Sequence, residues 1–355
     1  MTDDARDLAL GATRGPVVLA SAVRSTVEFA VALGSDRAAL LSRIGVTEAD
    51  LADPDGAVPV DAHTAAWAIL DEHEAADTLS LDLAGQFRLD QLGVFGFVVA
   101  NAATGRDVIE CIRRYRNLFG GDPYTPDIDE RDETVVMHRV FEPKIARQRV
   151  SSEMAPATTV AFLRQLLALD HSEPLVREVW FQHDAPREPS AHEKFFGCSV
   201  LFSAPETRLV LDGAVLDRPV TKRDAGLHAY LERHARALSL SFAQRGSIGE
   251  SVRAIVAETL QSGEPSPADV AKKLGMSERT LQRRLKEEER TFADLLDTVR
   301  RELAVRYLGD PDLAVYEVAL LLGYADASSF HRAFRRWTGE SPSELRARLR
   351  SFTPA

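Results

Sequence analysis

The last third of the chain contains two similar segments, and this internal repeat restricts the possible folds more than any other feature. The segments are "ADVAKKLGMSERTLQRRLKEEERTFADLL" and "YEVALLLGYADASSFHRAFRRWTGESPSEL". Both contain A-x-x-L-G, then an apolar residue, then a run with helical spacing of apolar and basic residues. Ala271 and Gly275 correspond to Ala319 and Gly323 at an offset of 48, and the runs that follow correspond at an offset of 49. The repeat predicts one small structural unit used twice.

Each copy has the residues that a helix-turn-helix motif requires. Two steeply crossing helices need a small residue where they approach and a glycine that allows the turn, often with positive φ. Ala271 with Gly275, and Ala319 with Gly323, are expected to take these roles. The sequence therefore predicts two helix-turn-helix motifs in this part of the chain.

The second helix of each predicted motif has an apolar face and a polar face. Phe330, Phe334 and Trp337 recur at helical spacing in the second copy and are expected to pack on the core. The opposite faces hold groups that can bond base edges or phosphates, because arginine can bond guanine and glutamine can bond adenine. We call these faces the first stripe, Arg279, Gln282, Arg283 and Lys286, and the second stripe, Ser328, His331, Arg332 and Arg335. One basic stripe is usually a solvated surface, but two copies in the same pattern favour DNA binding.

A single helix is predicted between the two copies, over residues 291–308. Thr291 with Asp294, and Ser341 with Glu344, have the spacing by which a hydroxyl caps a helix start. The 18 residues would span about 27 Å, and major grooves on one face of DNA recur about every 34 Å. One rigid helix can therefore hold two DNA-reading helices near adjacent grooves.

The first part of the chain predicts a helical beginning followed by mixed α and β structure. Helical spacing occurs in "SAVRSTVEFAVALG", "RAALLSRIG", "DAHTAAWAILDEHE", "EMAPATTVAFLRQLLALD" and "TKRDAGLHAYLERHARALSL", and as two helices broken near Thr104 in "LGVFGFVVANAATGRDVIECIRRYRNLFGG". Strands are predicted at 134–141, 177–183 and 207–213. Periodicity is lost in "SFAQRGSIGE", which suggests a domain boundary near residues 241–246.

From about Gly263 to Leu349 the chain resembles the DNA-binding domain of the AraC/XylS family of bacterial transcription regulators. "ALLLGYADASSFHRAFRRWTGESPSELR" follows that family's signature closely. The earlier part resembles more loosely the OruR-like branch, whose effector domain is of the arabinose-binding type, in "LGVFGFVVANAATGRDVIECIRRYRNLFGG" and "FFGCSVLFSAPETRLVLDGAVLDRPV". The resemblance implies base contacts at Arg279, Gln282, Arg283, Ala327, Ser328, His331 and Arg332. Because Ala327 and Ser328 are short, they suit a phosphate or a thymine methyl better than direct readout.

The predicted fold class is an α+β effector domain followed by an all-α domain with two helix-turn-helix motifs joined by a long helix. We assign residues 1–240 to sensing or dimerisation and residues 247–350 to DNA binding. The motifs are expected at about 266–288 and 314–338. The function implied is a ligand-responsive transcription regulator, and an activator because activation is the commoner mode in the family. Its expected partners are double-stranded DNA, RNA polymerase and a small-molecule effector, and both a monomer and a homodimer remain open.

The sequence does not identify the effector. Aromatic residues with a few polar groups make ligand sites, and six such candidates are Trp67, Phe95, Phe97, Asn101, Arg114 and Tyr115, although each also suits an ordinary core or surface position. Enzymatic patterns such as HExxH, a dinucleotide loop or a G-x-S-x-G elbow do not occur. No enzyme activity and no cofactor is therefore expected, and the alternative is a catalytic or carrier first domain tethered to DNA.

Charge and composition are consistent with this interpretation. The net charge is −11, but residues 265–355 hold 16 Lys and Arg against 14 Asp and Glu, whereas the rest holds 27 against 40. Locally basic patches on an acidic protein can still contact phosphates. No apolar run is long enough for a membrane helix, and the acidic start lacks a secretory signal, so a cytoplasmic protein is expected. Cys111 and Cys198 are too far apart in sequence for a metal motif and are expected to be structural thiols.

Overall fold

The structure is a computed structural model that describes residues 16–73, 76–119, 127–131, 134–139, 148–221, 223–245, 248–260, 265–309 and 313–352. The chain divides into two compact units. Unit 1 comprises Met1–Ser203 and Thr207–Gly246, and unit 2 comprises Ala204–Glu206 and Ser247–Ala355.

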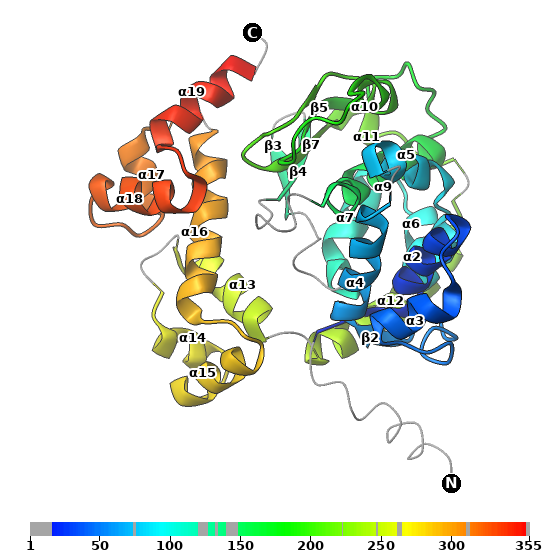
Figure 1. Cartoon of the computed structure of the whole chain (residues 1–355), viewed down its shortest axis with the longest axis horizontal. Helices are drawn as coiled ribbons and strands as arrows, with labels where there is room; N and C mark the ends of the chain where they lie inside the picture. Colours follow the sequence, from blue (N-terminus) through cyan, green and yellow to red (C-terminus); the bar gives the residue numbers. More distant parts are fainter. Residues whose placement is uncertain are drawn as a thin grey trace. The chain divides into compact units, whose positions relative to one another are not determined.

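The described part of unit 1 starts with a short strand that the sequence did not predict, continues mainly with helices, as the sequence predicts, and becomes a mixed α and β structure (Figure 1). Its helical elements are α2 (Ala20–Ala32), α3 (Arg37–Ile44), α4 (Val60–Asp71), α5 (Ala76–Gln86), η1 (Leu89–Leu92), α6 (Gly93–Ala100), α7 (Gly105–Arg114), η2 (Arg116–Leu118), α9 (Arg149–Leu167), α10 (Ser190–Phe196), α11 (Gly213–Leu216) and α12 (Ala225–Arg245). Its strands are β1 (Val17–Leu19), β2 (Ala57–Pro59), β3 (Asp127–Arg131), β4 (Thr134–Arg139), β5 (Val176–Trp180), β6 (Val200–Leu201) and β7 (Thr207–Asp212).

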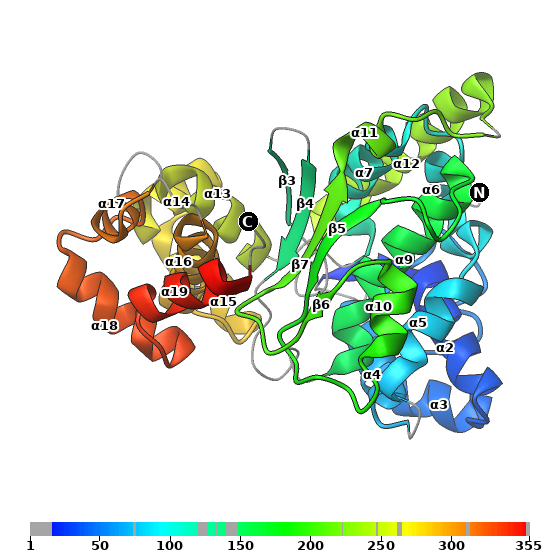
Figure 2. The same ribbon diagram turned by 90° about the horizontal axis from the view of Figure 1, so that it is seen from above.

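The strands of unit 1 form two sheets. Strands β1 and β2 pair antiparallel, with Val18 opposite Val58. The larger sheet has the order β3-β4-β7-β5-β6 and is antiparallel except between β5 and β6. β-branched residues of β4 and β7 pair at the centre, where Val136 lies opposite Val210 and both are buried. The helices of unit 1 lie on one face of this sheet (Figure 2).

Two hydrophobic clusters hold unit 1 together. One joins β4, β5 and β7 to α6, α7 and α9, and the other joins α2, α3 and α4 to the start of α9. Helix α9 belongs to both clusters, since Val150 and Met154 pack in the second and Leu163 and Leu167 in the first. This helix therefore positions the helical layer against the sheet.

Unit 2 is all helical in its described residues from 248 onward. Its helices are α13 (Ile248–Leu260), α14 (Pro267–Lys273), α15 (Glu278–Glu287), α16 (Phe292–Leu308), α17 (Val315–Leu321), α18 (Ala327–Thr338) and α19 (Pro342–Phe352). Helices α14 and α15 lie at one end of α16, and α17 and α18 lie at the other (Figure 1). Thr291 caps α16, which covers the stretch that the sequence predicts as one helix.

The elements predicted from sequence are present, with differences at their ends. The strand predicted at 134–141 ends at Arg139, and residues 140 and 141 lie outside the described residues. Helix α12 continues to Arg245, so the loss of periodicity after residue 240 does not mark the end of that helix. The pattern fades because Leu240 is 62% exposed, whereas Phe242, two residues later, is buried again.

Candidate nucleic-acid interface and effector cavity

The corners between α14 and α15 and between α17 and α18 are built by the same backbone hydrogen bonds. In the first, Gly275 N donates to Lys272 O at 3.1 Å and Met276 N donates to Ala271 O at 3.0 Å. In the second, the matching bonds are Gly323 N to Leu320 O at 2.9 Å and Tyr324 N to Ala319 O at 3.0 Å. This is the Schellman arrangement, which needs a left-handed residue after the helix. Gly275 and Gly323 supply it with φ of 67° and 75°.

A small buried residue precedes each of these glycines. Ala271 and Ala319 are each 1% exposed, in the first helix of each corner. A methyl group lets two crossing helices approach, and a longer side chain at this place would force them apart. The roles expected from the sequence for these two alanines and their glycines agree with this geometry.

The second helix of each corner starts at a side-chain cap. Ser277 accepts a hydrogen bond from Thr280 N at the start of α15, and Asp326 accepts one from Ser329 N at the start of α18. The caps satisfy backbone N–H groups that a helix start leaves unpaired. Thr291 and Ser341 cap α16 and α19 in the same manner, as their spacing to Asp294 and Glu344 predicts.

The apolar faces of α15 and α18 are buried. Leu281 and Leu285 of α15 are 0% and 1% exposed, and Phe330 and Phe334 of α18 are both 0% exposed. Trp337, expected in the core, is half-buried and meets Phe334 edge-on at a ring-centroid distance of 6.4 Å. Burial of these faces fixes the rotation of each helix, and so decides which side chains face solvent.

The side chains predicted to bind DNA lie on the opposite faces. Both stripes are outward: Arg279, Gln282, Arg283, Lys286, Ser328, Arg332 and Arg335 are exposed, and His331 is half-buried. Ala327 is half-buried at the first position of α18. The structure thus brings each predicted set together on one helix face and leaves it accessible.

The two stripes differ in the partners that they hold without DNA. On α15, Gln282 Nε2 donates to Glu278 Oε1 at 3.1 Å, and Arg283 Nη1 pairs with Glu287 Oε1 at 2.6 Å. On α18, Arg332 Nη2 donates to the hydroxyl of Ser329 at 3.1 Å. An exposed ion pair is worth at most about 1 kcal/mol, so Arg283 can exchange Glu287 for a base or a phosphate at small cost.

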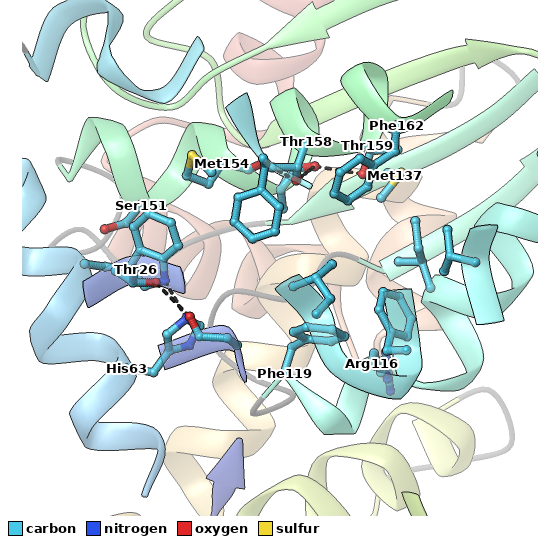
Figure 3. A pocket seen from close by; sticks show the side chains of 18 residues that line it. Thr26, His63, Arg116, Phe119, Met137, Ser151, Met154, Thr158, Thr159 and Phe162 are labelled. Atoms are coloured by element: carbon cyan, nitrogen blue, oxygen red, sulfur yellow. Dashed lines mark hydrogen bonds between the residues drawn. The ribbon is translucent and has the colours of Figure 1, made fainter. Parts of the chain in front are cut away.

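A cavity of about 160 Å³ lies inside unit 1 (Figure 3). Its wall is built by α2, α4, α6, α7, α9, strand β4 and the segments around η1 and η2. Aromatic rings contribute much of the wall, namely Trp67, Phe87, Phe95, Phe119 and Phe162. The polar side chains are Thr26, His63, Arg116, Ser151, Thr158 and Thr159. A concave, mainly apolar site with a few polar groups is the usual form of a small-molecule site.

Sequence reasoning found only part of this wall. Of the six candidates, Trp67 and Phe95 line the cavity. The other four lie elsewhere: Phe97 is 45% exposed, Asn101 accepts a hydrogen bond from Asp224 N, Arg114 pairs with Glu232, and Tyr115 is 1% exposed. The wall residues missed on α9 face the cavity from a helix whose apolar pattern also serves two core clusters, so its sequence carries no separate signal.

A buried carboxylate with two histidines joins α5, α9 and α10, and no sequence pattern predicts it. Glu153 is 0% exposed, and the hydroxyl of Ser80 donates to its Oε2. Nε2 of His183 and Nε2 of His192 each lie 2.9 Å from its Oε1. Burial alone would raise the pKa of Glu153, but the hydrogen bonds and charges of the two histidines outweigh burial and hold it below its usual value. The three residues are spread over 40 positions of sequence, which explains why they were missed.

The thiols have the environment of structural cysteines. Burial raises the pKa of Cys111 to about 12 and that of Cys198 to about 11, so little thiolate forms at neutral pH. Within the described parts of the chain, no group of three or more His, Cys, Asp or Glu side chains is arranged to hold a metal ion. None of the described helices has both the length and the apolar character that a membrane span needs.

Comparison with known protein families matches both parts of the chain. Residues 34–220 match the arabinose-binding domain of AraC transcription regulator, N-terminal, and residues 270–348 match a helix-turn-helix domain. Together with the paired corners of unit 2 and the cavity of unit 1, these matches define a DNA-binding transcription regulator with an effector-binding type of domain.

Several named proteins are similar over most of their length. The Ornithine utilization regulator of Pseudomonas aeruginosa is 30% identical over 273 residues, covering 76% of this chain and 78% of that protein. An uncharacterized HTH-type transcriptional regulator of Mycobacterium bovis is 30% identical over 339 residues, covering 92% and 95%. The crystal structure of transcriptional regulator CdpR from Pseudomonas aeruginosa has a TM-score of 0.43 and 25% identity, covering 87% of this chain and 95% of that one.

The chain belongs to the AraC family of transcription regulators. The resemblance noted in its sequence is confirmed in both parts, including the arabinose-binding type of the first domain. The relatives are described as transcription regulators rather than as enzymes.

Proposed function

We propose that α14 with α15, and α17 with α18, are two helix-turn-helix motifs, and that α15 and α18 enter adjacent major grooves of DNA. The observation that carries this proposal is the repetition of one corner, with the same hydrogen bonds, buried alanine and left-handed glycine, at both ends of α16. The 17 residues of α16 extend about 26 Å, near the roughly 34 Å between successive major grooves. One copy of the chain then contacts two segments of a site.

Within each motif, the outward stripe supplies the contacts. Arg283 and Arg332 are proposed to bond base edges, most suitably guanine, and Gln282 to bond adenine. Arg279, Lys286, His331 and Arg335 add base or phosphate contacts, while Ala327 and Ser328 contact a phosphate or a thymine methyl. We expect α15 to make more direct base contacts than α18, because its stripe has two arginines, a lysine and a glutamine.

Unit 1, with a domain limit near residue 240, is proposed to sense a small molecule in its cavity. An effector can shift a regulator between states only if it binds them with different affinity. We further propose that the protein activates transcription through RNA polymerase. It would do so in the cytoplasm, as a monomer or as a homodimer. Neither the arabinose of the family's domain name nor the ornithine of the relative's name suits a wall formed mainly by aromatic and aliphatic side chains, because both molecules carry several groups that need hydrogen-bond partners.

Residues 247–355 are expected to bind duplex DNA on their own, with an affinity that falls as salt rises. The reason is that contacts between cationic side chains and phosphates release counterions. Titration of a labelled duplex, followed by fluorescence anisotropy from about 50 to 200 mM salt, measures this for the fragment and the full chain. Absence of binding by both proteins at low salt would rule out the proposed function.

Arg283→Ala and Arg332→Ala are each expected to weaken binding of a selected site by about 1 to 3 kcal/mol and to relax the preference at one base position. Selection of binding sites from a random duplex pool, followed by affinity measurement, tests both effects. Arg284→Ala is the matched control, because Arg284 is exposed on α15 but lies outside the first stripe. Equal weakening on every sequence would make Arg283 and Arg332 phosphate contacts instead of base contacts.

A further inference from the structure

The size of the cavity in unit 1 limits what it can hold. Its volume of about 160 Å³ is close to that of an engineered apolar protein cavity, of roughly 150 Å³, that binds benzene. Phe119 and Phe162 present rings to this space, and Met137 and Met154 add polarisable side chains that adapt to a ligand's shape (Figure 3). The cavity thus suits one small ring or a branched chain of similar size.

The threonine hydroxyl groups in the wall already donate hydrogen bonds to backbone carbonyl groups of the protein. Thr26 donates to Ala22 O at 3.1 Å, and Thr159 donates to Ala155 O at 2.8 Å. Thr158 donates to Met154 O at 2.6 Å. A hydroxyl oxygen that has donated can still accept a hydrogen bond. These side chains therefore favour a ligand that donates a hydrogen bond over a ligand that can only accept one.

The other polar groups deep in the wall, those of His63, Trp67 and Ser151, carry no positive charge that could bind an anion. The indole Nε1 of Trp67 donates to His63 Nε2 at 2.8 Å, and burial lowers the pKa of His63 to about 4, so its ring is neutral at neutral pH. Ser151 donates to the carboxylate of Asp71 at 2.5 Å, which adds negative charge behind that part of the wall. Figure 3 shows Arg116 at the end of the set away from Ser151 and His63; its side chain is exposed and has contacts of its own within the protein.

We propose that this cavity binds a neutral, mainly apolar molecule of about six to ten non-hydrogen atoms, a small aromatic or branched alcohol or phenol, with its one hydroxyl donating to a threonine oxygen of the wall. This inference rests on the proposed function, since it specifies the effector of the proposed sensing domain. A carboxylate of the same shape is disfavoured because it would lose its hydration, and the one cationic side chain among the described lining residues, Arg116, lies at one end and has contacts of its own within the protein. A sugar or an amino acid is disfavoured more strongly, because each carries several polar groups that would lose their hydration.

Three probes of nearly one shape separate the alternatives: benzyl alcohol, benzoate and benzylamine, with L-arabinose and L-ornithine added. Calorimetric titration of the full chain at pH 7 measures binding, and the shift of the thermal unfolding midpoint provides a second readout. Benzyl alcohol is expected to bind at least about tenfold more tightly than benzoate or benzylamine, because each ion would lose its hydration in a wall whose described residues include no carboxylate for the ammonium and only Arg116, at one end, for the carboxylate. The sugar and the amino acid are expected to cause no shift.

Variants that fill the cavity connect the binding to this site. Ala22→Leu and Ala155→Leu add a side chain to the wall from two different helices, and each is expected to reduce benzyl alcohol binding at least about tenfold. Ala32→Leu is the matched control, because Ala32 is exposed on the same helix as Ala22. If one filling variant fails to fold, the other still tests the site.

The outcomes for the cavity and for the proposed function can be told apart, because DNA binding is measured on the same protein. Tighter binding of the neutral probe, lost in the filling variants and kept in Ala32→Leu, supports the inference. Preference for benzoate, benzylamine, the sugar or the amino acid would overturn it, and so would absence of binding by every probe. Loss of DNA binding by the free protein would instead contradict the proposed function and leave the ligand result standing.

Discussion

Phe334→Ala is expected to destabilise unit 2 by about 3 to 5 kcal/mol and to abolish DNA binding by the full chain. Phe334 is 0% exposed, and its ring lies 5.6 Å from that of Phe330 and 6.4 Å from that of Trp337, measured between centroids. The substitution removes a ring at the centre of the second motif and leaves a cavity. Because domains are stable by only about 5 to 15 kcal/mol, much of the unit's stability would be lost.

Denaturant unfolding and DNA titration measure this result on the same preparation. Phe97→Ala is the matched control, since Phe97 is 45% exposed on α6 of unit 1, and it is expected to have a small effect on both. Benzyl alcohol binding should survive Phe334→Ala because the cavity lies within unit 1. Full DNA affinity in Phe334→Ala would show that α18 does not need its aromatic core to reach DNA.

Glu153→Gln is expected to lower the free energy of unfolding of unit 1 by roughly 3 kcal/mol at neutral pH. The carboxylate is fully buried and is shared by His183, His192 and Ser80, which come from three other segments. An amide keeps the shape but loses the charge and one of the two acceptor oxygens. Both histidines would then be buried beside a weaker hydrogen-bond partner. Removing one partner of a buried network costs more than replacing all of its members with apolar groups.

The effect should depend on pH in a defined direction. The pKa of Glu153 in the folded protein lies below the ordinary value of 4.5, because the two histidines outweigh the effect of burial. A carboxyl group of this kind contributes its full stability above the unfolded value and loses it as pH falls through the lower folded value. The difference between the parent and Glu153→Gln is therefore expected to be largest near neutral pH and to shrink below about pH 4.5.

Urea unfolding at several pH values measures this difference. Glu48→Gln is the control, because Glu48 also has a lowered pKa but lies at an exposed ion pair with Arg37, where removal of the charge should change little. A difference between parent and Glu153→Gln that grows as pH falls would have the wrong sign for a carboxylate held by two histidines.

Much of unit 2 could be predicted from the sequence because its chemistry is local. The left-handed glycines, the buried alanines and the capping residues act within a few positions of the chain, and each leaves a recognisable pattern. The outward positions of Arg283 and Arg332 followed from the burial of Leu281 and Phe330 on the other side of their helices. Helix α13 was not predicted, although Val252, Val256 and Leu260 have helical spacing and pack on α14 to α16.

Unit 1 was predicted less completely because several of its elements depend on distant partners. Strands β1, β2 and β6 have two or three residues, too few for an alternating pattern, and each exists because another strand pairs with it. Strand β3, "DIDER", has the composition of a charged surface loop and is defined by pairing with β4. Helix α10 follows "APREP", which by composition indicates a loop.

The sequence by itself determined the family, the repeated helix corners and the faces of α15 and α18 that meet solvent, because periodicity and local hydrogen bonding decide these. Only the tertiary structure decided the cavity and the buried Glu153 cluster. The cavity is bounded by residues from position 22 to position 162, and the cluster joins Ser80 to His192. The shape and charge of such sites come from packing between segments far apart in the chain, and no local pattern records which side chains will meet there.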